Sequence, residues 1–458
     1  MTPRMHRVAL PFLALALACE ETSDVDVALA GGDTTVFDST GNAFALSARN
    51  MSFDRRQHFV VGNSFFNKNW VAAPSSTASR DGLGPTFNAR SCSTCHRKDG
   101  RGRPPGPGEE FTSMLLRLSL PGVGAHGGPL AAGPYGDQLQ PQAIAEVPAE
   151  GTPRVRYVER AGQFADGTTY SLRVPNYTIE SPSLGPLPAG LLISPRVAPA
   201  MIGMGLLAAI PEADLLARAD PDDDDGDGIS GRPNRVWDAA AGEPALGRFG
   251  WKANQPSVRQ QTAGAFLGDM GISSSLFTDQ NCPEGQAACA AAPTGGAPEI
   301  DDDLLADVVF YSSTLAVPAR RDLGDPAAKR GEQQFLAAGC DACHTPRQRT
   351  AADDPLIEAA GQTIFPYTDL LLHDMGPELA DGRPDYEASG SEWRTPPLWG
   401  IGLIETVNGH SDLLHDGRAR SRMEAVLWHG GEGQAARDAV LTLSADERAD
   451  LDAFLRSL

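Results

Sequence analysis

After its first nineteen residues the sequence contains no long hydrophobic run. A membrane-spanning helix needs about 18 or more consecutive apolar residues, so we expect none in the body of the protein. Basic residues are also scarce, with 38 Lys and Arg against 59 Asp and Glu, and the net charge is −21. Nucleic acids and anionic membrane surfaces are bound through clustered Lys and Arg, so this charge balance argues against both kinds of partner.

Aromatic residues make up only 7% of the chain, but apolar residues as a whole reach 41%, which is too high for a wholly disordered protein. Glycine and proline are abundant, at 49 and 36 residues. The length of 458 residues is enough for two or three domains.

The N-terminus has the features of an export signal. Residues 1–19 begin with basic residues and continue with an apolar run, which is the pattern of a signal peptide. The run ends in Ala-Leu-Ala-Cys, which resembles a bacterial lipoprotein box with Cys19 as the lipidated residue. Ordinary cleavage beside an incidental cysteine is the alternative. Residues 20–49 are predicted to form a polar tether. We therefore expect a periplasmic protein, held to a membrane by its N-terminal lipid.

Two Cys-X-X-Cys-His motifs, at 92–96 and 340–344, contain four of the seven cysteines. In this motif the two thiols bond to the vinyl groups of a haem and the histidine ligates the iron. Structural zinc sites and redox dithiols also use Cys-X-X-Cys, but two copies with the adjoining histidine in an exported chain favour covalent haem. The predicted attachment residues are Cys92, Cys95, Cys340 and Cys343, and the predicted iron ligands are His96 and His344.

Two further cysteines, Cys282 and Cys289, lie close together in a segment predicted to be a loop. An exported protein folds in an oxidising compartment, where such a pair forms a disulfide. We therefore predict a small disulfide loop there, which leaves Cys19 for the lipid.

The chain is predicted to consist of two halves, each with one haem motif. A helical pattern at 301–315 ends the first half, and a capped helical pattern at 444–458 ends the second. These patterns place one domain at 50–318 and another at 326–458.

An internal repeat supports this division. The segments 196–207 and 394–404 both run from Arg through Pro to a Gly-X-Gly sequence, and each follows its haem motif. The first half is longer because it contains an insertion, in which 154–159 and 168–174 alternate polar and β-prone residues around an Asp-Gly turn. This pattern predicts a β-hairpin.

Five segments of the sequence are distinctive: CSTCHRKDGRG (92–102), GRFGWKA (247–253), CDACHTP (340–346), EWRTPPLWGIG (392–402) and LHDGRARSRMEAVLWHGGE (414–432). Together they resemble the di-haem oxidoreductase family, also called thiol oxidoreductases, which is related to the bacterial di-haem cytochrome c peroxidases. The resemblance implies a mainly α fold of two cytochrome-c-like domains, with the β-hairpin inserted in the first. It also implies two haems, one that transfers electrons and one that reacts with the substrate.

The resemblance also implies a distal ligand for the second haem. In the di-haem peroxidases a segment like FHDG is followed fourteen residues later by the distal methionine; here His415 begins the HDG sequence and His429 stands at that spacing. His429 is the expected ligand, and Met375 in the HDMG segment is the alternative. A histidine in place of the thioether lowers the reduction potential of the iron. Surface or supporting roles are the alternatives for His373, His415 and His429.

For the first haem the sequence does not rank the distal candidates. Those in the first half are His58, Glu109, Glu110, Met114, His126 and Met270. An open distal side would suit peroxide, and a strongly ligated one would suit electron transfer alone.

Trp251 lies in the GRFGWKA segment. A tryptophan relays electrons between the haems of the related peroxidases, so the resemblance implies this role for Trp251. Packing at the domain interface is the alternative.

An acidic segment at 220–230 places Asp223, Asp225 and Asp227 at positions 1, 3 and 5 of a loop like that of an EF-hand. Alternating carboxylates suit calcium, but Asn234 stands where the usual glutamate would be. A solvated acidic turn is the alternative.

Together these features predict an exported, peroxidase-like di-haem oxidoreductase. Electrons from a small donor protein, of the cytochrome or cupredoxin type, would enter through the second haem and pass to the first, which delivers them to peroxide or another small oxidant. One alternative is an electron carrier without enzymatic activity. Another is an enzyme that oxidises a protein or small molecule, like the di-haem enzyme that matures a tryptophan-derived quinone. The sequence leaves open whether the protein forms a homodimer, as many relatives do.

Overall fold

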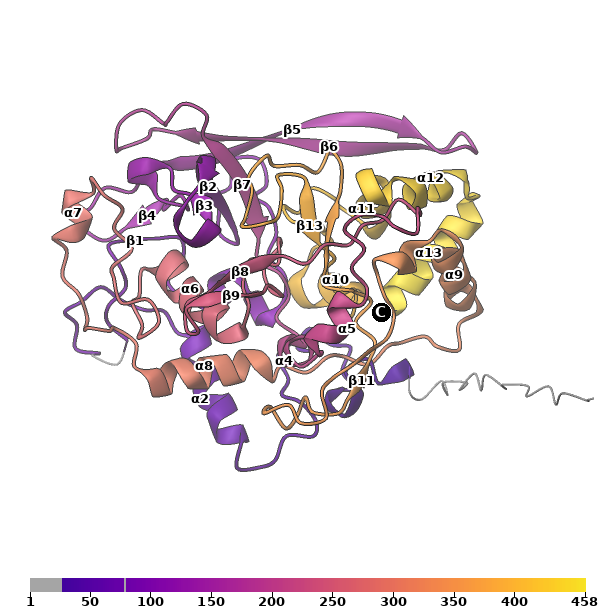
Figure 1. Ribbon diagram of the computed structural model, residues 1–458, viewed down its shortest axis with the longest axis horizontal. Helices are drawn as coiled ribbons and strands as arrows, with labels where there is room; N and C mark the ends of the chain where they lie inside the picture. The colour runs from indigo at the N-terminus through magenta and orange to yellow at the C-terminus, as the bar shows by residue number, and fades with distance from the viewer. Residues whose placement is uncertain (1–26, 78–79) are drawn as a thin grey trace, which may run out of the picture.

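The computed structural model describes residues 27–77 and 80–458, and Figure 1 shows the path of the chain. The predicted signal peptide and Cys19 lie outside the described residues. The α-helices are α2 Arg56–Asn67, α3 Cys92–Cys95, α4 Met204–Ala208, α5 Glu212–Leu216, α6 Val258–Met270, α7 Ala287–Ala290, α8 Asp302–Ser313, α9 Pro326–Ala337, α10 Ile404–Asn408, α11 Arg422–Leu427, α12 Gln434–Thr442 and α13 Ala445–Ser457. Short 3₁₀ helices are η1 Gly32–Thr34, η2 Arg97–Asp99, η3 Ala125–Gly127, η4 Gly133–Tyr135, η5 Cys340–Ala342, η6 Ile401–Leu403 and η7 Gly431–Gly433. In this part of the chain no helix is long and apolar enough to cross a membrane.

The strands form several small sheets. They are β1 Thr86–Phe87, β2 Met114–Val123, β3 Pro129–Leu130, β4 Gln142–Ala143, β5 Thr152–Gln163, β6 Thr169–Glu180, β7 Leu192–Val197, β8 Arg235–Asp238, β9 Glu243–Leu246, β10 Gln348–Arg349, β11 Thr363–Ile364, β12 Leu372–Asp374 and β13 Glu392–Arg394. One sheet has three strands in the order β3–β2–β7, and the others described pair two antiparallel strands each.

The prediction of a mainly α fold built from two cytochrome-c-like domains is wrong. Only 29% of the chain is helical, and 18% is in strands. Local sequence patterns could not show pairs such as Met114 with Val197, which join strands distant in the sequence. The abundant glycine and proline residues also keep most helices short, because both disfavour helix interiors.

In each half, the helix before the haem motif crosses a later helix at a glycine. Helices α2 and α8 approach so closely that a Cβ on Gly62 would lie 2.1 Å from the carbonyl oxygen of Asp307. Helices α9 and α13 meet in the same way, and a Cβ on Gly331 would lie 1.9 Å from the carbonyl oxygen of Asp450. Only a residue without Cβ permits this approach. Each glycine therefore allows the helix that precedes its motif to pack closely on the later helix.

An aromatic residue of the same helix lies next to each motif histidine. The ring centroid of Phe66 on α2 is 6.2 Å from that of His96, and Phe335 on α9 is 6.4 Å from His344. Phe335 also packs on Phe454 of α13 at 5.2 Å. The two halves therefore repeat a helix, a haem motif and a crossing helix.

The helix starts predicted at the end of each half are confirmed. Asp301 precedes α8 and its carboxylate accepts a hydrogen bond from the amide of Leu304 at 2.7 Å. Ser444 and Glu447 form a complete capping box at the start of α13. Both caps satisfy amide groups that would otherwise lack partners in the first helical turn.

The predicted hairpin is present and is longer than its sequence pattern indicated. Strands β5 and β6 pair antiparallel over their whole lengths. Figure 1 shows the hairpin along the top of the molecule, from the β7 side toward α11 and α12. At its turn, the amide of Ala165 donates to the carbonyl oxygen of Leu441 at 3.0 Å, and Asp166 pairs with Arg448 at 2.8 Å. The hairpin thus connects the two halves.

Residues 27–49, which belong to the predicted tether, pack against the body of the protein. Ala43 and Phe44 are fully buried in the main hydrophobic core. The amide of Val36 donates to the carbonyl oxygen of Val317 at 3.1 Å. This part of the segment is therefore integral to the fold, and the rest of it lies outside the described residues.

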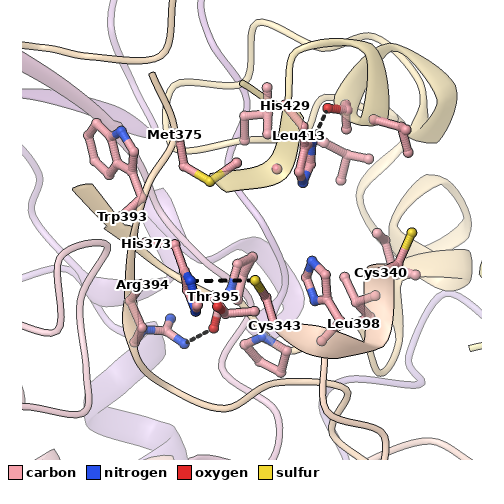
Figure 2. Close-up of a pocket in the computed structure, with 18 of the residues that line it drawn as sticks. Cys340, Cys343, His373, Met375, Trp393, Arg394, Thr395, Leu398, Leu413 and His429 are labelled. Atoms are coloured by element: carbon pink, nitrogen blue, oxygen red, sulfur yellow. Dashed lines mark hydrogen bonds between the residues drawn. The ribbon is translucent and has the colours of Figure 1, made fainter. Parts of the chain in front are cut away.

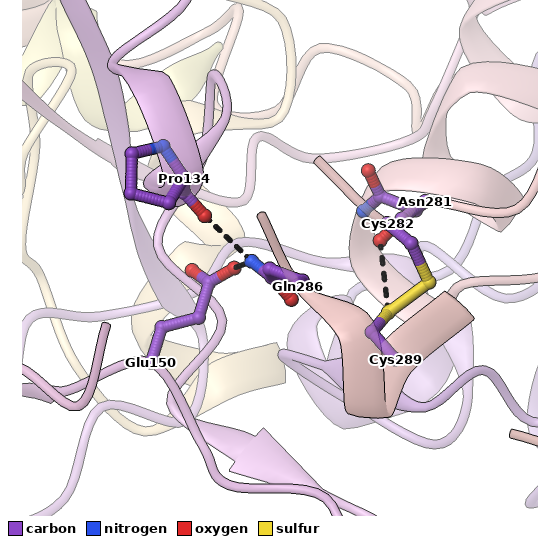
Figure 3. The surroundings of a disulfide bond; sticks show 6 residues. All are labelled: Pro134, Glu150, Asn281, Cys282, Gln286 and Cys289. Carbon is purple, nitrogen blue, oxygen red and sulfur yellow. Dashed lines mark hydrogen bonds between the residues drawn. A yellow bond between two sulfur atoms is a disulfide. The ribbon is translucent and has the colours of Figure 1, made fainter. Parts of the chain in front are cut away.

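Cys282 and Cys289 are joined by a disulfide, next to a buried carboxylate (Figure 3). Gln286, inside the loop that the disulfide closes, donates to Glu150 at 2.6 Å and to the carbonyl oxygen of Pro134 at 2.7 Å. Glu150 lies just before β5 and is 1% exposed. The disulfide loop is thereby attached to the base of the hairpin.

We expect the stability of the protein to depend on the ionisation of Glu150. Burial raises its pKa from 4.5 to about 7, although hydrogen bonds from Gln140 and Gln286 favour the ionised form. The folded protein therefore binds this proton more tightly than the unfolded chain does. The contribution of Glu150 to the free energy of unfolding should therefore fall as the pH rises from 4.5 to about 7, by on the order of 3 kcal/mol, and then remain level.

Urea denaturation at about pH 5 and about pH 8 measures this effect. The Glu150→Gln variant cannot ionise at this position, so its stability relative to the wild type should rise over this interval. An equal change of stability in the two proteins would contradict the assignment.

Candidate haem sites

The second Cys-X-X-Cys-His motif opens onto a cavity of about 490 Å³, a volume typical of ligand and cofactor sites. Helix α9 ends at Ala337, shortly before the motif, and the segment that begins with η5 places Cys340, Cys343 and His344 at one wall. Figure 2 shows Cys340 and Cys343 on one side of the cavity and Met375 and His429 on the opposite side. The motif and both predicted distal ligands therefore face the same space.

Backbone carbonyl groups fix the orientation of both histidines. The Nδ1 of His344 lies 3.0 Å from the carbonyl oxygen of Tyr367, and the Nδ1 of His429 lies 2.8 Å from that of Ala425. An Nδ1–H that donates to a carbonyl leaves Nε2 free to bind a metal. Burial lowers the pKa of His344 to about 4 and also lowers the pKa of His429, so both rings are neutral near pH 7.

Met375 lies beside His429 on the far wall. It directly follows β12, and its amide donates to the carbonyl oxygen of Ser391 at 3.0 Å. A Cβ on Gly433 would lie 3.1 Å from the Cβ of His429 and 3.3 Å from the Cε of Met375, so the two side chains flank one glycine. The structure brings both candidates to this wall, and the choice between them stays a prediction.

The remaining wall of the cavity suits a haem. Much of it is formed by apolar side chains, as a porphyrin requires. The Nε1 of Trp399 and the Nε2 of His415 are buried there, and neither has a hydrogen-bond partner within the described part of the chain. Arg394 lines the same cavity. Buried polar atoms without partners are costly, and the two carboxylates of a haem can bind such groups. The residues present therefore fit this cofactor.

The first motif repeats the arrangement around its histidine. Helix α3 carries Cys92 and Cys95, and the Nδ1 of His96 lies 2.8 Å from the carbonyl oxygen of Pro199. Burial lowers the pKa of His96 to about 4, which leaves a neutral ring with a free Nε2. Burial also raises the pKa of the Cys92 thiol to about 12. His96 is therefore oriented for an iron in the same manner as His344.

His373 is buried next to the second motif. The sequence had left a surface or supporting role open for this residue. It is 2% exposed, and its ring nitrogens contact Asp369 at 2.8 Å and Glu432 at 2.6 Å. Burial lowers its pKa, but hydrogen bonds to these carboxylates raise it to about 12 overall, so the ring is an imidazolium. Its Nδ1 also lies 3.4 Å from the Sγ of Cys343 (Figure 2). His373 thus places a positive charge beside the thiol of Cys343 and has no free nitrogen for iron.

A protein-family model matches most of the chain. The model is described as "Di-haem oxidoreductase, putative peroxidase", and it matches residues 24–119 and 187–458. The chain belongs to the di-haem oxidoreductase family. The resemblance noted in the sequence is thereby confirmed, and the two haems of this family correspond in number to the two motifs.

Two other comparisons add little to this result. No curated protein matches this di-haem oxidoreductase. Among solved structures, the hydrazine synthase of Kuenenia stuttgartiensis is similar at 13% identity over 100% of both chains, with a TM-score of 0.35. A score this low supports no argument about fold or function.

In this di-haem oxidoreductase, Trp251 contacts segments of both halves. It is 6% exposed and lines the cavity, and its Nε1 donates to the carbonyl oxygen of Val197 at 2.8 Å. The guanidinium of Arg101, which follows the first motif, lies 5.1 Å from its ring centroid. The backbone carbonyl oxygen of Trp251 accepts a hydrogen bond from the amide of Arg394 at 2.9 Å. This position is compatible with electron relay and with packing.

The distal candidates for the first haem lie in different surroundings. His58 is largely exposed and pairs with a carboxylate of α8 at 2.6 Å, and His126 stacks on a tryptophan at 4.0 Å. Met270 is buried in the core cluster against which Cys92 packs. Met201 packs against the same cluster and was not among the sequence candidates, although it lies within the first copy of the repeat, at 196–207. The others are the exposed residues Glu109 and Glu110, and Met114, which is buried in β2.

The acidic loop brings together a different set of carboxylates from the predicted one. Oxygen atoms of Asp220, Asp223 and Asp225 lie within 4.8 Å of one another. The carboxylate of Asp227 is outside this group and accepts a hydrogen bond from the amide of Ile229 at 2.8 Å. The EF-hand pattern predicted Asp227 as the third carboxylate of the group. In the structure the loop turns so that Asp220 takes this place beside Asp223 and Asp225.

Proposed function

We propose that this di-haem oxidoreductase is an exported, peroxidase-like enzyme with a haem covalently attached at each motif. Electrons from a small cytochrome or cupredoxin enter at the second motif, pass to the first and reach peroxide or another small oxidant there. Bound haem supplies the one-electron chemistry of this scheme. The chain attaches the two groups, orients the histidines and encloses the second group in a largely apolar cavity.

The observation that carries this proposal is the wall opposite the second motif. His429 and Met375, both able to bind iron, face the cavity across from the motif. An iron held on both sides has no open position for a substrate, which suits electron transfer. The substrate is then assigned to the first motif, and an open position there is supported by the polar candidates His58 and His126, which have other partners.

Haem counting and spectroscopy test the proposal. Protein produced with c-type haem maturation should contain two covalent haems, one of them high-spin and altered by peroxide. Replacing both Cys340 and Cys343 with serine should leave one covalent haem in a pyridine haemochrome assay, because these thiols are the attachment points of the second group. Replacing Cys282 and Cys289 with serine is the matched control and should leave the haem count at two.

A non-enzymatic electron carrier is the alternative function. The thioether groups of the buried Met270 and the half-buried Met201, in the core region that Cys92 contacts, favour it, since a sulfur ligand would close the first haem to substrate. In that case both haems would be low-spin and unchanged by peroxide. That result would overturn the peroxidase proposal.

Export with a lipid anchor at Cys19 forms part of the proposal. The N-terminal sequence pattern supports it, and so does the disulfide between Cys282 and Cys289, because such bonds persist in oxidising compartments such as the periplasm. Use of Trp251 as an electron relay is supported by its contacts with both halves.

Calcium binding by the acidic loop stays a prediction, now centred on Asp220, Asp223 and Asp225. The loop is connected to the second motif through Ser230, whose hydroxyl donates to Glu432 at 2.7 Å, and Glu432 contacts the imidazolium described above. A bound ion would therefore stabilise a loop that contacts the haem site.

A further inference from the structure

The β5–β6 hairpin belongs to the part of the chain that the family model leaves unmatched, since the match stops at 119 and resumes at 187. The hairpin nevertheless contacts the loop at 412–418, which belongs to the second half. Leu413, Leu414 and His415 of this loop line the cavity of the second motif. An insertion thus holds a loop that forms part of the wall of the cofactor site.

Arg173 of β6 makes the central contacts with this loop. Its Nε donates to the carbonyl oxygen of Arg418 at 3.0 Å, and its Nη2 donates to the carbonyl oxygen of Gly417 at 2.7 Å and to the carboxylate of Asp412. The side chain is only 16% exposed, and its guanidinium lies 4.7 Å from the ring centroid of Tyr157. A planar guanidinium that binds three acceptors of one loop restricts the conformation of that loop.

A second set of contacts leads from the hairpin to the predicted iron ligand. The hydroxyl of Tyr177 on β6 donates to Asp416 at 3.1 Å. Asp416 is fully buried and pairs with Arg418 at 3.0 Å. The guanidinium of Arg418 lies 4.9 Å from the ring centroid of Trp428, which immediately precedes His429. The hairpin therefore supports both the loop at 412–418 and Trp428, the residue next to the predicted ligand His429.

We propose that the hairpin is a strap that positions the wall of the second cavity, with Arg173 as the main positioning residue. The inference rests on the proposed function in one respect, namely that a haem occupies the cavity. The order of the loop itself is a property of the chain alone. Without the strap, His415 and His429 would move relative to His344, and the ligand geometry at the iron would vary between molecules.

Hydrogen–deuterium exchange tests the effect on the loop. In Arg173→Ala, amides in a peptide covering 410–422 should exchange about tenfold faster than in the wild type, because the loop loses its charge-assisted hydrogen bonds. Arg156→Ala is the matched control, since Arg156 lies on the exposed side of the same hairpin and should leave exchange unchanged. Wild-type exchange in Arg173→Ala would overturn the proposal.

Electron paramagnetic resonance of the haem-loaded protein tests the effect on the site. Arg173→Ala should keep the wild-type haem count, and its low-spin signal from the second haem should broaden or split while the signal from the first stays unchanged. A wild-type signal from the second haem would overturn the proposal. If the wild type itself has no haem at the second motif, the proposed function fails, and the exchange result still decides whether the strap orders the loop.

A second variant keeps the test decisive if Arg173→Ala does not fold. Arg173→Lys retains the charge, but an ammonium cannot bind all three acceptors in the same geometry. Exchange in the 410–422 peptide should still be several-fold faster than in the wild type. Unchanged exchange in Arg173→Lys would overturn the role of the guanidinium.

Discussion

His429→Met is expected to raise the reduction potential of the second haem by on the order of 100 mV, within the wide range that axial ligands control. A thioether stabilises ferrous iron more than an imidazole does. His429 is neutral, faces the cavity and has its Nδ1 held by the carbonyl oxygen of Ala425, so its Nε2 is available to the iron. A redox titration followed by visible spectroscopy measures the potential, and the far-red ligand band reports the change of ligand.

Met375→Leu is the matched control for this experiment. Met375 occupies the same wall, and leucine keeps its apolar bulk without the sulfur. If His429 is the ligand, Met375→Leu leaves the ligand band and the potential close to those of the wild type. A changed band in Met375→Leu together with an unchanged band in His429→Met would identify the thioether as the ligand and leave His429 a supporting role.

Gly331→Ala is expected to reduce the free energy of unfolding by about 3 kcal/mol, even though alanine is the better helix former by about 1 kcal/mol. The new Cβ would lie 1.9 Å from the carbonyl oxygen of Asp450, a backbone atom that cannot rotate away. Helices α9 and α13 must then separate, and Phe335 moves with α9 next to His344. Urea denaturation measures the loss, and the spectrum of the second haem should change as well.

Gly324→Ala provides the control, because Gly324 is exposed and a Cβ there would have no atom within 4 Å. Its stability should equal that of the wild type. Gly62→Ala repeats the test at the crossing of α2 and α8 and should disturb the first haem instead of the second. If Gly331→Ala is as stable as Gly324→Ala, the helices can adjust at no cost and the crossing does not constrain the site.

Features encoded within short segments could be predicted from the sequence. The capping box at Ser444 and the hairpin around its Asp-Gly turn both depend on residues a few positions apart. Gly331 and Phe335 stand one helical turn apart, so their common face before the second motif was also visible. In each case the physical cause is local hydrogen bonding or helical periodicity, which the sequence records directly.

Features that join distant segments could not be predicted in this way. The fold class was wrong because the small sheets depend on pairs such as β2 with β7, and no local pattern specifies a partner strand. The imidazolium of His373 needs Glu432, which is 59 residues further along the chain. The membership of Asp220 in the acidic group depends on how its loop turns. Tertiary context decides all three.

The strap has a consequence for the order in which the protein matures. Its contacts join Arg173 to Asp412 and Asp166 to Arg448, which are 239 and 282 residues apart, and contacts of such separation form late in folding. In the folded chain, burial raises the pKa of the Cys340 thiol to about 12 and raises that of Cys343, so both react slowly. If a haem is attached covalently at the second motif, as proposed above, we expect the attachment to precede closure of the strap, because a chain that folds first would be a poor acceptor.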